Sequence, residues 1–589
     1  MFDTNNMPFK GIQKYFADFM VSLSDNLRER EKYHLWLASI LLVDFVKKGH
    51  ICIDLKDFAE REFTIDEDGT SFSIKCPSLE TWIDALKKAE VVGTSDEFRP
   101  LILRNERMLY LNRYWQYEKV FVAKMLQKIS LKPAKLDNSL IMPIINRLFP
   151  ETDEDDKDMQ KMAAINAVEN NFLVISGGPG TGKTFTISKI LALLIEAGSG
   201  NLSIALAAPT GKAAARLKAM IKDLKMKIDC PEYVRANMPE EVYTIHRLLG
   251  LSYRTRRFEF NEKNPLPYDV VIVDEGSMVD LPLMSKLLEA TKDSTKIILV
   301  GDKDQLSSVE PGAVFGELCE TIQDMPNMIV ILKKNFRFGR DSGINRLAEL
   351  IKEGNGHEAM HLIKEGRLEN ISWREVESQS HLRLMIENYI VERYTSFFDA
   401  SSSIEEAFLH FDKFHVLCAL RHGPFGILAI NDLIEKALSD KKIIRAFKKW
   451  YRGKPIMITA NDYSLKLFNG DTGIIFEDPE NSDFLKIFFK TEEGLKKIAP
   501  QRIADFETAY AITVHKSQGS EFDDIVFILS DTSSEIFTRE LIYTAITRAK
   551  RSIEIWGNEQ LFIEAIKKRI ERKSGIKDAF LQNKKTCDF

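Results

Sequence analysis

The middle of the chain alternates short apolar runs with longer stretches of helical periodicity. Four of the runs are rich in Val, Ile, Leu and Ala: FLVIS (172–176), SIALAAP (203–209), DVVIVDE (269–275) and KIILVGD (296–302). Continuous apolar strands of this kind, separated by helices, are typical of a parallel sheet that is covered on both faces. The pattern therefore predicts an α/β domain.

A second series of apolar runs begins near residue 410. It contains KFHVLCAL, AYAITVHKSQGSEF, DIVFILS and RSIEIWG in that order, and it predicts a second α/β core. Within this series, residues 453–478 hold strand-forming segments that are separated by Asn-Asp and Asn-Gly-Asp turn signals. We expect a small all-β insertion there.

The amino-terminal part of the chain has a different pattern, mainly helical with a few short strands and many aromatic residues. An acidic run, FPETDEDDKDMQ, follows it, and runs of like charge are usually solvated linkers or helix starts. The predicted division is an N-terminal domain at 1–130, an acidic linker region at 131–158, a first α/β domain at 159–350, and a second at 351–589 with the β-rich insertion at about 450–505.

Composition and charge add little to this picture. A chain of 589 residues is too long for a single hydrophobic core, so we expect several domains. The longest apolar stretch, Leu35 to Val43, is far shorter than the roughly 20 residues that span a bilayer. The first residues carry no secretory signal, so we expect a cytoplasmic protein. The six cysteines form no CxxC pair, which argues against a zinc or iron–sulfur site. Because the net charge is −5, any nucleic-acid contact must lie in a local groove.

The segment ISGGPGTGKTFT (175–186) follows the first apolar run and fits the pattern G-x-x-x-x-G-K-[ST]. In such a loop, backbone N–H groups surround the phosphates of a nucleoside triphosphate, the lysine pairs with the β and γ oxygens, and the threonine ligates Mg²⁺. The predicted nucleotide-binding residues are Gly177, Gly178, Pro179, Gly180, Thr181, Gly182, Lys183 and Thr184. Gln160, ahead of the loop, is either an amide that reads the base or a surface glutamine.

Two adjacent carboxylates, Asp274 and Glu275, end the run DVVIVDE. Carboxylates at the end of a buried strand are costly unless they hold something positive. We expect Asp274 to hold the Mg²⁺ shell together with Thr184, and Glu275 to polarise the attacking water. The loop and the acidic pair together predict triphosphate hydrolysis.

Three further polar residues lie on separate segments. Gln305 follows the fourth apolar run, where an amide can sense the γ-phosphate, while Arg337 lies in KKNFRFGR and Arg548 in LIYTAITRAKR. An arginine that comes from a distant segment often stabilises charge in the transition state, although each arginine alone would also fit a surface ion pair. The sequence predicts a site that closes between two domains. Its predicted catalytic residues are Lys183, Glu275, Gln305, Arg337 and Arg548.

Eight segments between Gln160 and Lys550 resemble, in order, the motifs of superfamily 1 DNA helicases and, within them, the RecD family. They are GGPGTGKT, APTGKAAARL, TIHRLLG, VDEGSMVD, GDKDQLSSVEPG, NFRF, TVHKSQGSEFDD and YTAITRAK. The resemblance implies two RecA-like P-loop NTPase domains, with an SH3-like all-β insertion in the second and a mainly helical N-terminal domain. It also implies ATP and Mg²⁺ as cofactors, and 5′–3′ translocation on single-stranded DNA.

The resemblance further implies that polar residues beside the strands hold the phosphates of single-stranded DNA, contacts that carry little sequence information. The candidates are Thr210, Lys212, His246, Asn469, Thr513, His515 and Lys516. A lone histidine or asparagine is also common in turns and cores, so that alternative stays open for His246 and Asn469. SYRTRRFEFNEKNPLP (252–267) resembles the pin on which such helicases split a duplex, or it is a plain solvated hairpin.

Four more segments look like the RecD subunits of the RecBCD helicase-nuclease. They are KKGHICIDL (47–55), MLYLNRYWQYE (108–118), VLCALRHGPFGILAIN (416–431) and NDYSLKLFNGDTG (461–473). The resemblance implies a bacterial, cytoplasmic heterotrimer with RecB and RecC. Such a complex acts on duplex DNA ends in double-strand break repair by homologous recombination and degrades linear duplex DNA, with the nuclease site expected in another subunit.

Two alternatives to a RecBCD subunit remain at this point. One is a stand-alone 5′–3′ helicase of the same family, and the other is a catalytically idle scaffold that binds DNA ends. The aromatic residues Tyr110, Tyr114, Trp115 and Tyr117 leave a similar choice, because aromatic enrichment fits both a packed core edge and a partner-facing surface.

Overall fold

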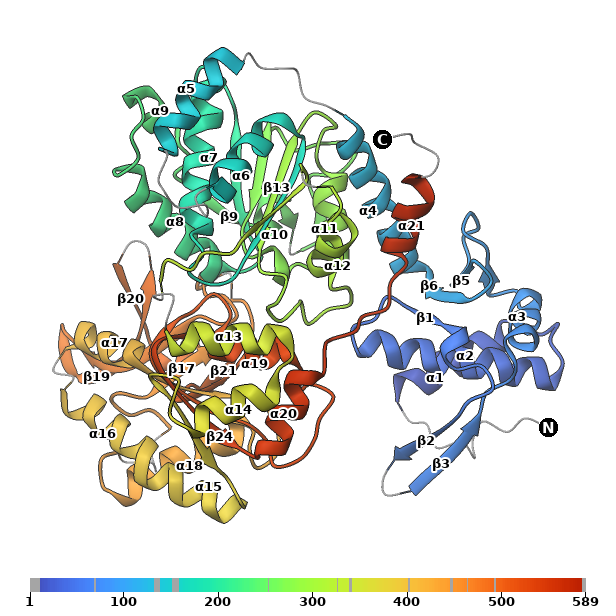
Figure 1. The fold of residues 1–589 in the computed structure, drawn as a ribbon. Coiled ribbons are helices and arrows are strands. Elements are labelled where there is room, and N and C mark those ends of the chain that lie inside the picture. Colours follow the sequence, from blue (N-terminus) through green and yellow to red (C-terminus); the bar gives the residue numbers. More distant parts are fainter. Residues whose placement is uncertain are drawn as a thin grey trace.

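The computed structural model contains an N-terminal domain and two domains that are built on parallel sheets (Figure 1). The residues that it describes are 11–67, 70–131, 138–150, 158–252, 254–325, 327–337, 342–400, 403–444, 449–462, 464–491 and 494–584. Most of the predicted acidic run, residues 151–157, lies outside them.

The first parallel domain contains a six-stranded sheet in the order β14-β7-β13-β12-β8-β9. Its strands are β7 (Phe172–Gly177), β8 (Ile204–Ala208), β9 (Val242–Thr244), β12 (Val270–Val273), β13 (Lys296–Gly301) and β14 (Ile329–Leu332). Its helices are α6 (Asp158–Glu169), α7 (Lys183–Ala197), α8 (Gly211–Lys225), α9 (Glu232–Asn237), α10 (Ile245–Leu248), α11 (Leu281–Glu289) and α12 (Val314–Thr321). Phe172 and Val174 of β7 pack into one core and Leu173 and Ile175 into another, so both faces are covered, as predicted.

The second parallel domain contains a five-stranded sheet in the order β15-β24-β23-β16-β22. Its strands are β15 (Ile371–Glu375), β16 (Phe414–Cys418), β22 (Ala511–Thr513), β23 (Phe522–Ile528) and β24 (Ala549–Gly557). Its helices are α13 (Gly343–Glu353), α14 (Gly356–Lys364), α15 (Gln379–Met385), α16 (Val391–Ala400), α17 (Ile404–Lys413), α18 (Ile427–Asp440), α19 (Arg539–Ile546) and α20 (Glu559–Lys567). Ile344 and Leu347 of α13 pack in this core, so it takes in residues ahead of residue 350, where we expected the boundary.

The insertion in the second domain is an antiparallel sheet in the order β20-β19-β18-β17-β21. Its strands are β17 (Pro455–Ile458), β18 (Thr472–Asp478), β19 (Asn481–Thr491), β20 (Gly494–Ile498) and β21 (Phe506–Thr508). Ile456, Ile475 and Ile487 form its small core. The insertion is all-β, and its likeness to an SH3 fold stays a prediction.

The N-terminal domain combines helices with a small sheet in the order β1-β6-β5-β4. Its elements are α1 (Ile12–Ser22), α2 (Glu29–Lys47), β1 (Cys52–Asp54), β2 (Glu62–Glu67), β3 (Thr70–Lys75), α3 (Leu79–Lys88), β4 (Val92–Gly93), β5 (Leu101–Arg104), β6 (Met108–Leu111) and α4 (Asn112–Ser130). The apolar stretch from Leu35 to Val43 lies buried inside α2. No helix among the described residues is long and apolar enough to cross a membrane.

The aromatic residues of β6 and of the start of α4 belong to a core. Tyr110 and Trp115 are buried, and Tyr114 and Tyr117 pack against the same cluster of apolar side chains. Of the two alternatives for these residues, the structure therefore favours the packed core edge.

Two segments differ from the predicted division of the chain. Helix α5 (Asn138–Leu148) falls within the expected linker region, residues 131–158, and packs against α7 of the first parallel domain. At the other end, α21 (Ile576–Lys584) leaves the second parallel domain and packs against α4 and α12 (Figure 1). The last part of the predicted second domain thus joins the N-terminal domain and the first parallel domain.

Candidate active site and nucleic-acid interface

The predicted phosphate-binding loop connects β7 to α7. Gly180 and Gly182 have φ angles of 82° and 81°, a left-handed conformation that side chains disfavour. A Cβ at Gly180 would lie 2.4 Å from Asn335 Oδ1, so space as well as conformation requires glycine there. Asn335 Nδ2 donates to Pro179 O at 3.0 Å, and the Phe336 N–H donates to Gly180 O at 2.7 Å. The loop is therefore held in shape from outside.

Lys183 lies along this loop in the structure. Its Nζ donates to the carbonyl oxygens of Gly177 at 2.6 Å and Gly178 at 3.1 Å, and Thr181 Oγ1 donates to Gly178 O at 2.8 Å. A phosphate oxygen is a stronger partner for an ammonium than a neutral carbonyl is. The free N–H groups at the start of α7 also favour an anion, so the loop fits a phosphate chain.

The acidic pair lies at the end of β12, beside the loop. Burial raises the pKa of Asp274 to about 6, and the adjacent Glu275 adds to this shift while Lys183 opposes it. Glu275 has a φ of 52°, and its N–H donates to Asp274 Oδ1 at 2.9 Å. A non-glycine residue in this conformation costs about 1–3 kcal/mol and is common at functional sites. A buried carboxylate near Thr184 fits a divalent cation, because a cation would offset the cost of its burial.

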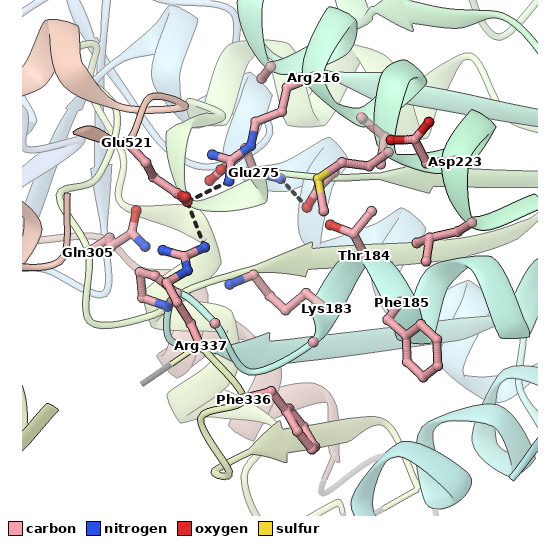
Figure 2. Close-up of a pocket in the computed structure, with 18 of the residues that line it drawn as sticks. Lys183, Thr184, Phe185, Arg216, Asp223, Glu275, Gln305, Phe336, Arg337 and Glu521 are labelled. Carbon is pink, nitrogen blue, oxygen red and sulfur yellow. Dashed lines mark hydrogen bonds and ion pairs between the residues drawn. The ribbon is translucent and has the colours of Figure 1, made fainter. Parts of the chain in front are cut away.

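Arginine side chains from two elements meet on one carboxylate across the domain boundary (Figure 2). Glu521 Oε1 accepts from Arg216 Nη2 at 2.5 Å and from Arg337 Nη2 at 2.8 Å. Burial would raise the pKa of Glu521, but the two guanidinium groups outweigh it and hold the pKa at about 2. Glu521 belongs to the second parallel domain and both arginines to the first, so this network joins the two domains.

The two predicted glutamines occupy different places. Gln305 lines the space beside the acidic pair, and its Nε2 donates to Asp302 Oδ2 at 2.8 Å. Tyr543 from the second domain donates to the same Asp302 oxygen at 3.2 Å. Gln160 is buried beside the loop, with Nε2 2.7 Å from where a Cβ on Gly182 would stand.

Arg548 completes this region from the second domain. Its side chain is 2% exposed, with Nε donating to Thr544 O at 3.2 Å and Nη1 to Ser520 O at 3.3 Å. Arg548 is one of the residues that line a cavity of about 440 Å³, which we call the nucleotide cleft. It brings together Lys183, Thr184, Asp274, Glu275, Gln305, Arg337 and Arg548.

A larger cavity, of about 760 Å³, lies between the same two domains, and we call it the groove. The predicted DNA-contact residues that line it are Thr210, Lys212, His246, Asn469, His515 and Lys516. Thr513 is not among the residues that line the groove; its Oγ1 accepts a hydrogen bond from the Lys516 N–H at 3.3 Å. Its direct contact with a strand stays a prediction.

The groove contains cations that are partly desolvated. Burial lowers the pKa of Lys212 and of Lys516 from their usual values, and it also lowers the pKa of His246. Lys516 Nζ donates to the side-chain carbonyl of Asn469, which comes from the all-β insertion. An anion in the groove would favour the charged form of each lysine, as the phosphates of a nucleic acid would.

A short hairpin stands at the edge of the groove. It consists of β10 (Leu251–Ser252) and β11 (Arg257–Phe258), and Leu251, Ser252 and Arg256 line the cavity. Tyr253, which follows Ser252 in the sequence, lies outside the described residues. The hairpin thus forms where it was predicted, and its use as a strand-separating pin stays a prediction.

The nucleotide cleft and the groove share two walls. Helix α8 begins in the groove with Gly211 and Lys212 and reaches the cleft one turn later with Arg216. The loop after β22 likewise runs from Lys516 in the groove to Glu521 in the cleft, and Arg216 links the two walls through Glu521.

The sequence analysis missed Arg216 and Glu521 as site residues. Both lie inside segments that already held predicted site residues, APTGKAAARL and TVHKSQGSEFDD. They are 305 positions apart, so no local pattern could pair them. The available signal was one unassigned basic residue in the first motif and three unassigned acidic residues, Glu521, Asp523 and Asp524, in the second.

Comparison with known families defines the class of protein first. The AAA domain family matches residues 160–311, and the UvrD-like helicase C-terminal domain family matches residues 508–553. A solved Bacteroides Pif1 helicase bound to single-stranded DNA is similar over 74% of this chain and 97% of that one, with a TM-score of 0.39 and 18% identity. The two family matches define the class as an AAA-domain protein with a UvrD-like helicase C-terminal domain, as the motifs predicted.

The family within this class follows from the rest of the chain. Residues 9–110 match the N-terminal domain of the RecBCD enzyme subunit RecD. The RecBCD enzyme subunit RecD of Mycobacterium tuberculosis is 36% identical over 92% of this chain and 90% of its own length. The ATP-dependent RecD2 DNA helicase of Deinococcus radiodurans is 27% identical over 69% of this chain and 50% of its own length. The chain belongs to the RecD family of RecBCD subunits, and the predicted resemblance is confirmed.

Proposed function

We propose that this chain hydrolyses ATP in the nucleotide cleft to move along a DNA single strand that is held in the groove. The observation that carries this proposal is that the two sites share walls. Because α8 and the loop from Lys516 to Glu521 each border both sites, closing the domains around a nucleotide must also shift the groups that hold the strand. Repeated closing and opening of the two domains, as nucleotide binds and leaves, would move the strand in steps.

In the cleft, we assign the phosphate contacts to Lys183 and to the backbone of the loop from Gly177 to Thr184. Thr184 and Asp274 are the residues that would hold Mg²⁺, which neutralises phosphate charge when it is bound. Glu275, beside Asp274, would orient the attacking water. The buried position of Gln160 beside Gly182 supports a role in reading the base.

The arginines of the cleft would act late in the cycle. Arg337 and Arg548 come from different domains, and both line the cavity that the phosphates would fill. We infer that Arg337 exchanges Glu521 for the γ-phosphate as the cleft closes, because a phosphate carries more charge than a carboxylate. Arg548 would then stabilise charge in the transition state. Gln305 and Tyr543 of the second domain both donate to Asp302, so a shift of Gln305 with the γ-phosphate would also change the contact between Asp302 and Tyr543.

In the groove, we assign strand contacts to the side chains of Lys212, His246, His515 and Lys516, with Thr210 and Asn469 beside them. Burial lowers the pKa of Lys212 and of Lys516 although carboxylates near each of them oppose the shift, so a phosphate would offset a cost that these carboxylates leave in place. Thr513 would act through the position of Lys516. Such contacts do not read bases, which suits a strand that must slide.

We further infer that the chain works as one subunit of an assembly with RecB and RecC on duplex DNA ends, moving 5′ to 3′ in double-strand break repair and degradation of linear duplex DNA. The match to a RecBCD subunit covers 90% of that protein, whereas the match to the RecD2 DNA helicase covers 50% of that one. This difference supports a subunit of an assembly over a stand-alone helicase.

Strand displacement tests the proposed function. The full chain, alone and with RecB and RecC, is given ATP, Mg²⁺ and duplexes that carry a single-stranded tail at either the 5′ or the 3′ end. Alone, the chain should displace the strand only from the 5′-tailed duplex, and it should co-purify with the two partners from native extract. Unwinding from the 3′ tail by the chain alone, or no unwinding from either tail in either mixture, would contradict the proposal.

A further inference from the structure

The segment between α20 and α21 links three parts of the molecule. Residues 568–575, which we call the strap, leave the second parallel domain and end where α21 docks on α4 and α12 (Figure 1). The family matches cover residues 9–110, 160–311 and 508–553, so the strap lies outside all three. Its contacts therefore have to be judged from the structure.

The backbone of the strap forms hydrogen bonds with the N-terminal domain. The Ile51 N–H donates to Lys573 O at 2.9 Å, and the Lys573 N–H donates to His50 Nδ1 at 2.9 Å. Further along, the Gly575 N–H donates to Glu118 Oε2 at 2.9 Å. These bonds hold the strap whatever its side chains do, and they set the position of Arg572 next to them.

Arg572 donates two hydrogen bonds to the loop between β13 and α12, residues 302–313. Its Nη2 donates to Ser308 O at 2.6 Å and its Nη1 to Glu310 O at 3.0 Å. The guanidinium also fills the space beside Gly49, where a Cβ would lie 2.8 Å from its Cζ. The Gly312 N–H donates to Gly49 O at 3.0 Å, so the N-terminal domain and Arg572 hold the same loop.

This loop borders both functional sites. Gln305 lines the nucleotide cleft, while Ser308 and Val309 line the groove. Between them, the Leu306 N–H donates to Thr544 Oγ1 at 2.9 Å, and Gln518 Nε2 donates to Leu306 O at 2.8 Å. The loop thus contacts the second domain at its centre and the strap at its far end, so its position depends on both.

Arg572 also lies close behind the groove wall. Burial lowers the pKa of His515, and the positive charge of Arg572 contributes to that shift. Since the carbonyls of Ser308 and Glu310 are neutral, the guanidinium charge adds to the field that an anion in the groove would meet.

We propose that Arg572 is a positioning residue for the groove, which fixes the wall formed by Ser308 and Val309 and ties strand affinity to the docking of the N-terminal domain. This inference rests on the proposed function, because it takes the groove as the strand-binding site. Hydrogen bonds from a charged donor to two carbonyls of one loop fix its distance and its orientation together, which a single bond could not.

The test compares variants of the full chain by ATPase activity against the concentration of an oligo(dT) single strand. In Arg572→Ala, the concentration for half-maximal stimulation should rise about tenfold, with a smaller change at saturating strand. Arg572→Lys keeps the charge but cannot make the paired bonds, so it should resemble Arg572→Ala, and it carries the test if the alanine variant does not fold. Lys573→Ala, which removes only the side-chain ion pair with Asp57 at 3.0 Å, is the matched control and should stay within about twofold of wild type.

Wild-type strand dependence in Arg572→Lys would overturn the positioning role, and so would an unchanged half-maximal concentration with a lower melting temperature in Arg572→Ala. Lys516→Ala separates this inference from the proposed function. If wild type responds to the strand and Lys516→Ala weakens the response, while both Arg572 variants match wild type, only the inference on Arg572 fails. If wild type does not respond to the strand at all, the proposed function fails.

Discussion

The nucleotide cleft and the groove lie between the same two domains but are built differently. In the cleft, charged side chains are bonded to one another across the boundary, as in Arg216–Glu521–Arg337. In the groove, Lys516 is bonded to the neutral Asn469, and the pKa of Lys212 is lowered by burial. Hydrolysis requires fixed distances to the reacting phosphate, whereas a strand that slides requires positive charge with little directional preference. The first site is therefore expected to be intolerant of substitution and the second to lose function in small steps.

The largest expected effect is that of Lys183→Gln in the cleft. Removing the ammonium from the phosphate-binding loop should lower ATP turnover by about 10³-fold or more, because Lys183 Nζ lies within hydrogen-bond distance of two carbonyls of the loop that would surround the phosphates. Lys189→Gln, in the same helix but outside the cleft lining, is the control. Steady-state ATPase and melting curves measure both; wild-type turnover in Lys183→Gln would reject the cleft as the hydrolytic site.

Arg548→Ala should have the next largest effect and should separate binding from turnover. Nucleotide affinity should change little while kcat falls by about 10²–10³-fold, because the charge is needed mainly in the transition state. Arg548 is buried, so Arg548→Lys serves as a second variant that fills most of the space. Fluorescent-nucleotide binding with single-turnover kinetics gives both quantities, and equal losses in the two would count against this role.

Glu521→Gln should have an intermediate effect, about tenfold on turnover, because Arg216 and Arg337 lose their shared counter-charge while the shape is kept. Adding Arg216→Ala to Glu521→Gln should cost much less than Arg216→Ala costs alone, with a coupling of about 1–2 kcal/mol in a double-mutant cycle. Asp523→Asn, two residues further along the chain in β23, is the control. Additive losses would show that Arg216 and Glu521 act independently.

Lys516→Ala in the groove should have the smallest effect. Single-strand affinity should fall several-fold and equally for strands of different base composition, and the slope of log affinity against log salt should become shallower by about 0.7. Titrations with oligo(dT) and a mixed-sequence strand measure this, with melting curves as the check on folding. A loss confined to one base composition would argue for base reading instead.

More of the residues of the cleft than of the groove could be assigned from the sequence, because phosphate chemistry restricts residue type and spacing. Lys183, Asp274 and Arg548 could each be assigned from a motif, and the structure brings them into one cavity. The groove depends on how loops, a hairpin and the β insertion pack, so a motif could name Thr513 as a candidate but could not tell that it bonds to the Lys516 N–H and does not line the cavity.

Features that depend on distant packing could not be predicted. Neither α5 within the expected linker nor the strap at residues 568–575 carries a local pattern that tells where it docks. The pairing of Arg216 with Glu521 has the same origin, since a salt bridge between two domains is set by the fold and not by spacing along the chain.

The most direct test of the account is the ATPase rate of the full chain against single-stranded DNA concentration at two salt concentrations. If strand binding in the groove favours hydrolysis in the cleft, oligo(dT) should stimulate the ATPase rate strongly. The oligo(dT) concentration for half-maximal stimulation should rise with salt, because phosphate contacts release counterions. An ATPase rate that is the same with and without the strand, or a stimulation that salt does not weaken, would contradict the claim that the two sites form one motor.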